Sequence, residues 1–224
     1  MSKAVVYRGG VQEFQGDREV YHVTFADGVT DIERAAFYDC KGLTNLSFLE
    51  GSVITTFEQE AFVRSGIITL LGMEGVRKIG RWAFANCKDL RTIEGLACEE
   101  MGEGCFGGCT LLQSMKGWPP SMTAIPAYTF SACTGMTSID CDLSHVTSIG
   151  ANAFWNCTSL LPPSLSSRDA DPAAVLAFLK RKSILERAPE RCAFLCSLKH
   201  AHSNFYDRTG DPAMFDKYKF DPNS

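Results

Sequence analysis

Apolar residues recur through the first three quarters of the chain with a period far longer than that of a helix or a strand. The clearest example is a set of phenylalanines spaced 22 to 25 residues apart, at Phe37, Phe62, Phe84, Phe106, Phe130 and Phe154. A repeat of roughly 20 to 30 residues is typical of a solenoid. One unit of this length cannot bury its own apolar face, so we expect successive units to stack and to share one core.

The residues around each phenylalanine follow the same period. A small residue stands directly before it, and a cysteine or serine stands three positions later, at Cys40, Ser65, Cys87, Cys109, Cys133 and Cys157. Apolar residues follow six and nine positions later, at Leu43, Leu46, Ile68, Leu71, Leu90, Ile93, Leu112, Met115, Met136 and Ile139. Equivalent residues in stacked coils lie about 4.8 Å apart. We therefore expect a buried column of aromatic rings and, beside it, a column of buried thiols.

Two short segments rich in β-branched residues, 90–93 and 146–149, predict strands that belong to different sheets. Parallel strands joined by crossover connections are almost always right-handed. The pattern therefore predicts a right-handed, mainly β solenoid of about six coils over residues 29–165.

The two ends of the solenoid need caps. At the start, Val5–Tyr7, Val11–Phe14 and Val20–Phe25 are predicted as short strands joined by tight turns, which would form an N-terminal β cap over residues 1–28. After residue 165 the pattern becomes helical. Asp171 followed by Pro172 predicts a helix start, and a second helix is expected to begin at Pro189.

The C-terminal quarter allows two interpretations. Helices within residues 166–206 either cover the last coil or form an independent module that docks a partner. Residues 207–224 contain Gly210, Pro212 and Pro222 and are expected to form a loop or a disordered tail.

The repeat resembles a known family. Residues 76–90 are V-R-K-I-G-R-W-A-F-A-N-C-K-D-L, and residues 146–160 are V-T-S-I-G-A-N-A-F-W-N-C-T-S-L. Both units resemble the BspA-like class of leucine-rich repeats, and the resemblance covers about residues 29 to 165. The second unit departs from the pattern at Ser65 and Gly66. The resemblance implies a binding scaffold, often adhesive on microbial surfaces, with no shared catalytic residues.

Composition and charge narrow the choice of partners. The net charge of −4 gives no reason to expect nucleic acid or an anionic membrane as a partner. Residues 1–10 contain no apolar run long enough for a secretory signal, and no stretch of the chain approaches the length of a transmembrane helix. We therefore expect an intracellular, cytoplasmic protein with reduced cysteines.

Several residue groups were considered as chemical sites. Cys192, Cys196 and His200, with His202 nearby, would spread over more than two helical turns, so packing is favoured over a zinc site. No cysteine carries a local signature of a catalytic nucleophile. The acidic residues at 94–103 are expected to form ion pairs with basic residues of the preceding coil. We therefore expect no enzymatic activity, no metal and no cofactor.

The outward residues of the predicted strands are the better candidates for a function. Between the core positions of each strand lie polar side chains, namely Thr44, Asn45, Arg91, Thr92, Gln113, Ser114, Thr137 and Ser138, interrupted by Thr69 and Leu70. Such residues either form a recognition surface or only keep an exposed sheet hydrated. Three aromatic residues, Trp82, Trp118 and Tyr128, are expected to add to a binding surface because Trp and Tyr are enriched at binding hot spots.

We therefore predict a non-catalytic scaffold or adaptor that binds another protein through the outward face of its sheet. Two alternatives remain open at this stage. One is a structural subunit of a larger complex that is anchored by the C-terminal helices. The other is a microbial cell-surface adhesin.

Overall fold

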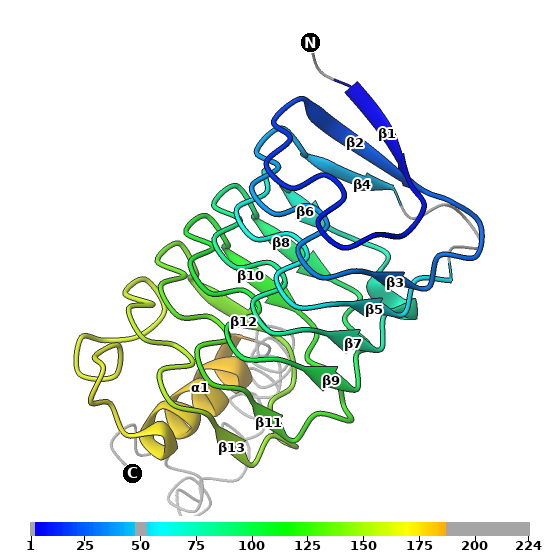
Figure 1. Cartoon of the computed structure of the whole chain (residues 1–224). Coiled ribbons are helices and arrows are strands. Elements are labelled where there is room, and N and C mark those ends of the chain that lie inside the picture. Colours follow the sequence, from blue (N-terminus) through cyan, green and yellow to red (C-terminus); the bar gives the residue numbers. More distant parts are fainter. Residues whose placement is uncertain (1–2, 48–52, 187–224) are drawn as a thin grey trace, which may run out of the picture. The chain divides into compact units, whose positions relative to one another are not determined.

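The computed structural model describes residues 3–47 and 53–186, which form a parallel β-solenoid followed by one helix (Figure 1). One side of the coils carries β1 (Lys3–Tyr7), β2 (Val20–Phe25), β4 (Asn45–Ser47), β6 (Thr69–Leu70), β8 (Thr92–Glu94), β10 (Ser114–Lys116) and β12 (Ser138–Asp140). A second side carries β3 (Asp31–Ile32), β5 (Thr56–Phe57), β7 (Lys78–Ile79), β9 (Glu100–Met101), β11 (Ala124–Ile125) and β13 (Ser148–Ile149). A short 3-10 helix, Met73–Gly75, lies between β6 and β7.

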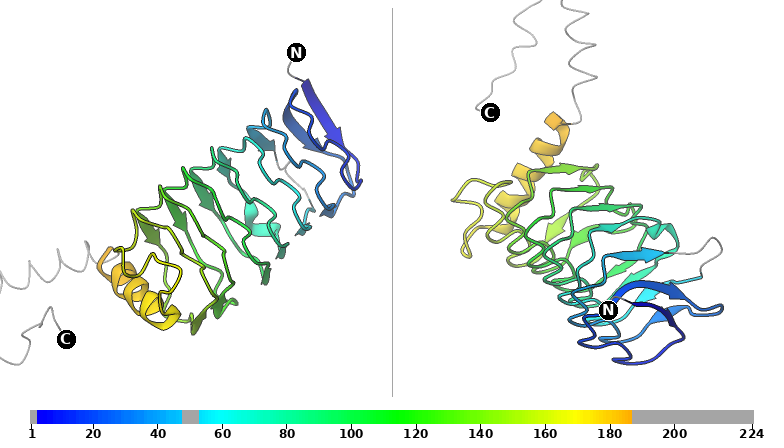
Figure 2. Two further views of the ribbon diagram at one scale, coloured as in Figure 1. Left: turned by 60° about the vertical axis from the view of Figure 1, so that its left-hand side comes forward. Right: turned by 90° about the horizontal axis from the view of Figure 1, so that it is seen from above.

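Every strand pairs in parallel with a strand of the neighbouring coil. The sheets run β1-β2-β4, β6-β8-β10-β12, β3-β5-β7-β9 and β11-β13. The two sides of the solenoid are visible as two stacks of strands in Figure 2. The predicted β-solenoid, with its strands in different sheets, is confirmed.

The predicted aromatic column is also confirmed. The six phenylalanine rings are buried, and successive ring centroids lie 5.1, 5.2, 5.6, 5.8 and 5.3 Å apart along the column. Each pair is stacked, with interplanar angles of 2° to 28°. This column, which we call the phenylalanine spine, passes through the interior of every coil that it joins.

The N-terminal segment differs from its prediction. Val11–Phe14 forms a turn instead of a strand, and β1 pairs with β2 in parallel instead of through a tight hairpin. The reason is that Phe14 adds a further ring to the spine, 5.4 Å from Phe37 and stacked on it. The N-terminal cap is therefore built as one more turn of the same solenoid.

The cysteine column has a specific bonding pattern. The thiols of Cys87, Cys109 and Cys133 each donate to the carbonyl oxygen of the phenylalanine one coil earlier, with Sγ–O distances of 3.1 to 3.2 Å. Cys40 and Cys157 make the same bond to Phe14 and Phe130. The eight cysteines within the described residues are reduced thiols and are buried, as predicted. We call this column the thiol ladder.

The second coil has a different register from the one predicted. Ile67 and Leu70 fill the core, whereas Ile68 and Leu71 are exposed. Leu70 is aligned with Ile93 of the next coil. The shift arises because the turn after Ser65 is one residue shorter than in the other coils. It is closed by Gly66, where a Cβ would overlap the carbonyl oxygen of Lys41.

The turn that carries each phenylalanine has a regular backbone. The residues two positions before and two positions after the phenylalanine have positive φ in every coil, for example Trp82 at 61° and Asn86 at 58°. Backbone N–H groups of this turn donate to the turn of the following coil, as in the bond from Phe84 to Cys105. These bonds hold the turns together where no strand exists.

The helix α1 (Pro172–Glu186) covers the last coil. Asp171 caps its N-terminus, because its two carboxylate oxygens accept from the N–H groups of Ala173 and Ala174 at 3.1 and 3.2 Å. Val175, Leu176, Leu179 and Ser183 are buried on the helix face that packs toward β12 and β13. The predicted helix start is confirmed. The second predicted helix, the tail and the residues Cys192, Cys196, His200 and His202 lie outside the described residues.

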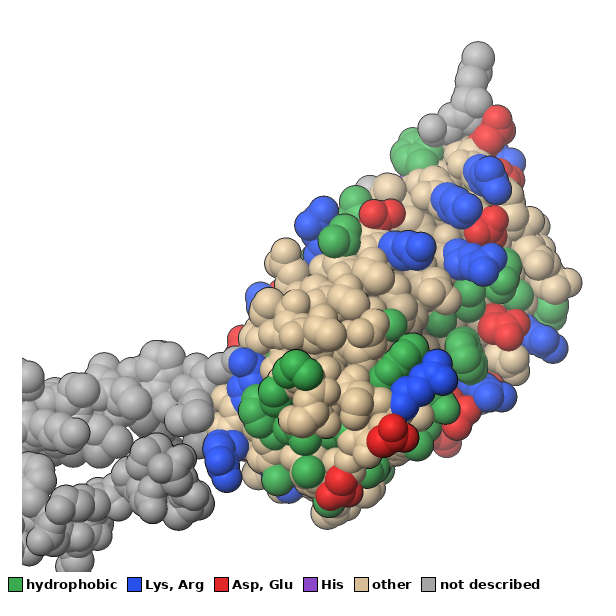
Figure 3. Space-filling model, turned by 90° about the vertical axis from the view of Figure 1, so that its left-hand side faces the viewer, with side chains coloured by type: hydrophobic (Ala, Val, Ile, Leu, Met, Phe, Trp, Pro, Cys, Tyr) green, Lys and Arg blue, Asp and Glu red, His purple; other side chains and the backbone are tan. Residues whose placement is uncertain are grey.

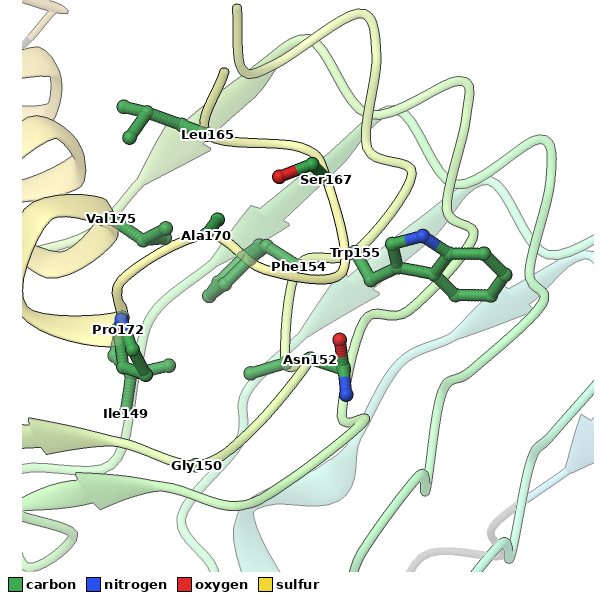
Figure 4. A pocket seen from close by; sticks show the side chains of 11 residues that line it. Ile149, Gly150, Asn152, Phe154, Trp155, Leu165, Ser167, Ala170, Pro172 and Val175 are labelled. Carbon is green, nitrogen blue, oxygen red and sulfur yellow. The ribbon is translucent and has the colours of Figure 1, made fainter. Parts of the chain in front are cut away.

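A small cavity of ≈ 20 Å³ lies under the last turn, between Phe154, Ala170 and Val175 (Figure 4). The buried Oδ1 atom of Asn152, which also lines this cavity, has no hydrogen-bond partner among the described residues. A cavity of this size holds one water molecule. We therefore expect an ordered water to occupy it.

Candidate partner-binding surface

The outward residues of the sheet β6-β8-β10-β12 lie in register and form straight columns. Strand pairing aligns Thr69, Thr92, Ser114 and Ser138. One residue earlier, backbone bonds align Thr44, Ile68, Arg91, Gln113 and Thr137. We call these two columns the ladder face. The side chain of Asn45, which was predicted to join them, lies outside the described residues.

The side chains of the ladder face are available to solvent. Arg91, Gln113 and Thr137 are exposed, and Thr92, Ser114 and Ser138 are half-buried. The alternating residues Leu70, Ile93, Met115 and Ile139 point to the core and are buried. The face therefore combines a rigid, in-register backbone with polar side chains that can donate and accept hydrogen bonds.

A third outward column borders the ladder face and carries charge. The ammonium of Lys116 lies 2.6 Å from the carboxylate of Glu94 on the adjacent strand. The hydrogen bond to Glu94 raises the pKa of Lys116. The neighbouring position in β12 is Asp140, which is aligned with Lys116. Charges of both signs therefore line one edge of the ladder face.

The structure separates the three predicted aromatic residues from the ladder face. Trp118 is only 5% exposed; its indole N–H donates to the carbonyl of Met122 at 3.0 Å, and its ring packs edge-on against Phe130. It is a core residue, because the longer turn after β10 folds it inward. Trp82 and Tyr128 are 38% and 39% exposed, but they lie on the turn side of the coils.

The turn side has its own surface chemistry. The ring of Trp82 lies over Gly104, where a Cβ would stand 3.4 to 3.6 Å from three ring atoms. The guanidinium of Arg81 lies 5.6 Å from the Trp82 ring, and the amide of Asn152 donates to the Tyr128 hydroxyl at 3.4 Å. In Figure 3, where the turn side faces the viewer, the middle of the surface is mostly uncharged.

Sequence reasoning missed an apolar part of the outward surface. Tyr21, Ile68 and Leu71 are 44%, 38% and 52% exposed. The period of the other coils predicts Ile68 in the core, which is one residue out of register with the structure. The β-branched pair Ile67 and Ile68 offered no way to choose between the two registers without knowing which residue pairs with Arg91.

Charged residues on the second side of the solenoid pair between coils, as predicted. Arg77 lies 3.6 Å from Glu99, and Arg81 lies 3.0 Å from Glu103. The partners in each pair are well exposed. Exposed ion pairs of this kind contribute roughly 0 to 1 kcal/mol each. These charges therefore neutralise one another and do not form an acidic or basic patch.

The buried thiols are not activated as nucleophiles. Burial raises the pKa of Cys87 to about 12 and that of Cys157 to about 12, and it raises the pKa values of Cys105, Cys109 and Cys133 well above their ordinary value. A nucleophilic cysteine needs the opposite shift, because the thiolate is the reactive form.

Within residues 3–47 and 53–186, no group of three or more His, Cys, Asp or Glu side chains is placed to hold a metal ion. The helix in this part of the chain is too short and too polar to cross a membrane.

The coil geometry, the phenylalanine spine and the thiol ladder define a leucine-rich-repeat type of solenoid. The family described as the BspA type leucine rich repeat region matches the chain in six copies, over residues 10–116 and 97–168. The chain belongs to this family, which is typically non-catalytic. The match begins at residue 10, in agreement with the additional turn around Phe14.

Two solved structures share the fold. A leucine-rich repeat protein of T. pallidum aligns with a TM-score of 0.62 at 19% identity, covering 79% of this chain and 76% of that one. A leucine-rich repeat protein of Bacteroides ovatus aligns with a TM-score of 0.58 at 24% identity, covering 69% of this chain and 40% of that one. No curated protein sequence matches significantly.

Proposed function

We propose that this protein is a non-catalytic scaffold that binds another protein through the ladder face. The observation that carries the proposal is the in-register sheet β6-β8-β10-β12, whose outward polar side chains are presented by a rigid core. Repeat proteins use extended surfaces of this kind for recognition. A rigid sheet loses little conformational entropy on binding, which favours affinity.

The chemistry of the ladder face indicates what it would recognise. Arg91 and Gln113 stand next to each other in one column, and Thr92 and Ser114 flank them in the other. Together they offer donors and acceptors around one positive charge, the guanidinium of Arg91. A partner surface with polar groups and a carboxylate opposite Arg91 would complement this arrangement.

The proposal is tested by comparing partners captured by the tagged chain with those captured by the double variant Arg91→Glu/Gln113→Lys. Extracts of the native source are used, and captured proteins are quantified by mass spectrometry. Truncating a binding hot spot costs about 2 kcal/mol or more, which is roughly a 30-fold loss of affinity. We therefore expect the variant to lose the specific partners.

The matched control is Arg77→Glu/Thr123→Lys, which makes the same changes of charge on the second side, at the residues that directly precede β7 and β11. It should retain the partners. Circular dichroism and the melting temperature verify that both variants remain folded. If the ladder variant keeps every partner of the unaltered chain, the ladder face is not the binding surface.

A further inference from the structure

The outer edge of β13 is an open end of its sheet. The N–H groups of Ser148 and Gly150 donate inward to the carbonyls of Thr123 and Ile125, at 3.4 and 2.7 Å. In a parallel pair the intervening residue faces the other way. The carbonyl of Thr147 and both backbone polar groups of Ile149 accordingly have no hydrogen-bond partner among the described residues.

The same positions are occupied in the earlier coils. The carbonyl of Thr55 accepts from Arg77 and Lys78 at 2.7 and 3.0 Å, and that of Phe57 accepts from Gly80 at 2.6 Å. At the opposite end of this side of the solenoid, the first strand β3 is followed by Glu33, whose N–H is satisfied by the hydroxyl of Tyr7 at 2.9 Å. At the N-terminal edge a side chain therefore satisfies the Glu33 N–H, whereas the outward groups of β13 have no partner within residues 3–47 and 53–186.

A groove runs along this open edge. It has a volume of ≈ 510 Å³ and lies between Thr147–Ile149 and one face of α1 formed by Pro172, Ala173, Leu176 and Ala177. Figure 4 shows Ile149 beside Pro172, where α1 begins. The volume is in the range of pockets that enclose small ligands. The short side chains of Ala173 and Ala177 leave the groove open.

The core beneath the groove is incompletely covered. Ile149 is half-buried, whereas the equivalent residues Ile32, Phe57, Ile79, Met101 and Ile125 are at most 9% exposed. In each earlier coil an apolar residue of the next coil covers this position. The groove thus combines unpaired backbone groups with an apolar floor. A single added β-strand supplies both the missing hydrogen-bond partners and an apolar side chain to cover the floor.

We propose that the β13 edge and its groove bind an extended segment of a partner protein, which adds to the β11-β13 sheet as a parallel strand. Two N–H groups of the segment donate to the carbonyls of Thr147 and Ile149, and one of its carbonyls accepts from the Ile149 N–H. The residue between the two donors carries an aliphatic side chain that covers Ile149 and Leu176. This site is separate from the ladder face and does not depend on it.

The next residue of the segment should be small. Gly150 occupies that place in the last coil, and a Cβ there would overlap the backbone N of Ala127. A bound strand would approach Gly150 just as Gly150 approaches the coil before it. The preferred segment therefore has a polar residue, then an aliphatic residue, then glycine, which is the local pattern of the solenoid itself at residues 148–150.

The test uses the full chain and a fluorescent peptide with the sequence of residues 144–152, with binding followed by fluorescence anisotropy. We expect saturable binding. N-methylation of the peptide amide at the position of Ser148 or Gly150 removes a donor and should weaken binding at least about 10-fold. N-methylation at the position of Ile149, whose amide faces away, should have the smaller effect.

Two variants of the protein locate the site. Ala177→Trp fills the groove and should abolish peptide binding. Ala174→Trp places the same side chain on an exposed position of α1 that does not line the groove, and it should leave binding unchanged. Arg91→Glu/Gln113→Lys should also leave peptide binding unchanged, which keeps this test independent of the proposed function.

Three results would overturn the proposal. The first is absence of peptide binding at millimolar concentration. The second is binding that is insensitive to Ala177→Trp or equally sensitive to all three methylations. The third is self-association of the unaltered chain in sedimentation that Ala177→Trp removes, because the occupant would then be a second copy and not a partner segment.

Discussion

The thiol ladder makes the folded state sensitive to alkaline pH. Burial holds the pKa of Cys87 and Cys157 at about 12 and raises those of Cys105, Cys109 and Cys133 well above the ordinary value. In the unfolded chain a thiol titrates near about 8.5. The unfolded chain therefore releases protons that the folded chain keeps. The free energy of unfolding falls as pH rises from about 8.5 toward about 12.

The size of the effect follows from these values. A pH of 9.5 is about one unit above the pKa of a thiol in the unfolded chain. Each thiol that stays protonated in the folded state therefore lowers the free energy of unfolding by about 1.4 kcal/mol. Five such thiols give a loss of about 7 kcal/mol. This is a large part of the roughly 5 to 15 kcal/mol that stabilises a typical domain. The protein is thus expected to be close to unfolding at pH 9.5.

The assay is urea denaturation followed by circular dichroism at pH 7.5 and pH 9.5, with a phosphine reductant. The double variant Cys109→Ala/Cys133→Ala should be less stable at pH 7.5, but its free energy of unfolding should fall only about three fifths as far between the two pH values. Tyr and Lys titrate above about pH 10 and contribute little in this range. An unchanged free energy of unfolding at pH 9.5, or an equal fall in the variant, would refute the reasoning.

Three further outcomes are expected. Phe106→Ala should lower the free energy of unfolding, measured by chemical denaturation, by about 3 to 5 kcal/mol, because it leaves a cavity in the phenylalanine spine. Leu111→Ala, at an exposed position, should lower it by under about 1 kcal/mol. Similar losses in the two variants would contradict the role of the spine in the core. In a Cys192→Ser/Cys196→Ser background, thiol reagents should modify the remaining cysteines only at the rate at which the folded protein unfolds locally or globally. Rapid labelling of most of these cysteines would disprove their burial. Asp171→Ala should lower the free energy of unfolding by about 1 kcal/mol and Asp171→Asn by less, and equal losses would argue against the cap.

Side chains with a fixed role in every coil were predictable from the sequence. The spine and the thiol ladder recur with one period because each must meet its equivalent one coil away. The helix start at Asp171 was also predictable, since capping is local. Features that depend on one coil alone were not. Phe14 joins the spine, but Asp17 stands where the other coils have cysteine or serine, so the period is hidden there.

The exposure of the candidate residues was predictable only in part. Alternation along a strand correctly placed Arg91, Gln113 and Thr137 outside. Trp118 lies on a longer turn and is buried, because the path of such a turn is set by tertiary packing and not by local pattern. The sequence predicted that the coils end near residue 165, where the pattern becomes helical. It could not show that the outward backbone groups of β13 lack a partner within the described residues, because this depends on where α1 packs.

The position of α1 also limits how the protein can assemble. The last coil exposes strand groups that another coil would match, and the first coil differs from it. Two unlike ends that fit each other make a head-to-tail contact, and a contact that does not close into a ring grows into a filament. Because α1 packs against β12 and β13, it lies at the end of the solenoid where a further coil would have to stack. We therefore expect the helix to hinder head-to-tail growth of the molecule through its own repeat.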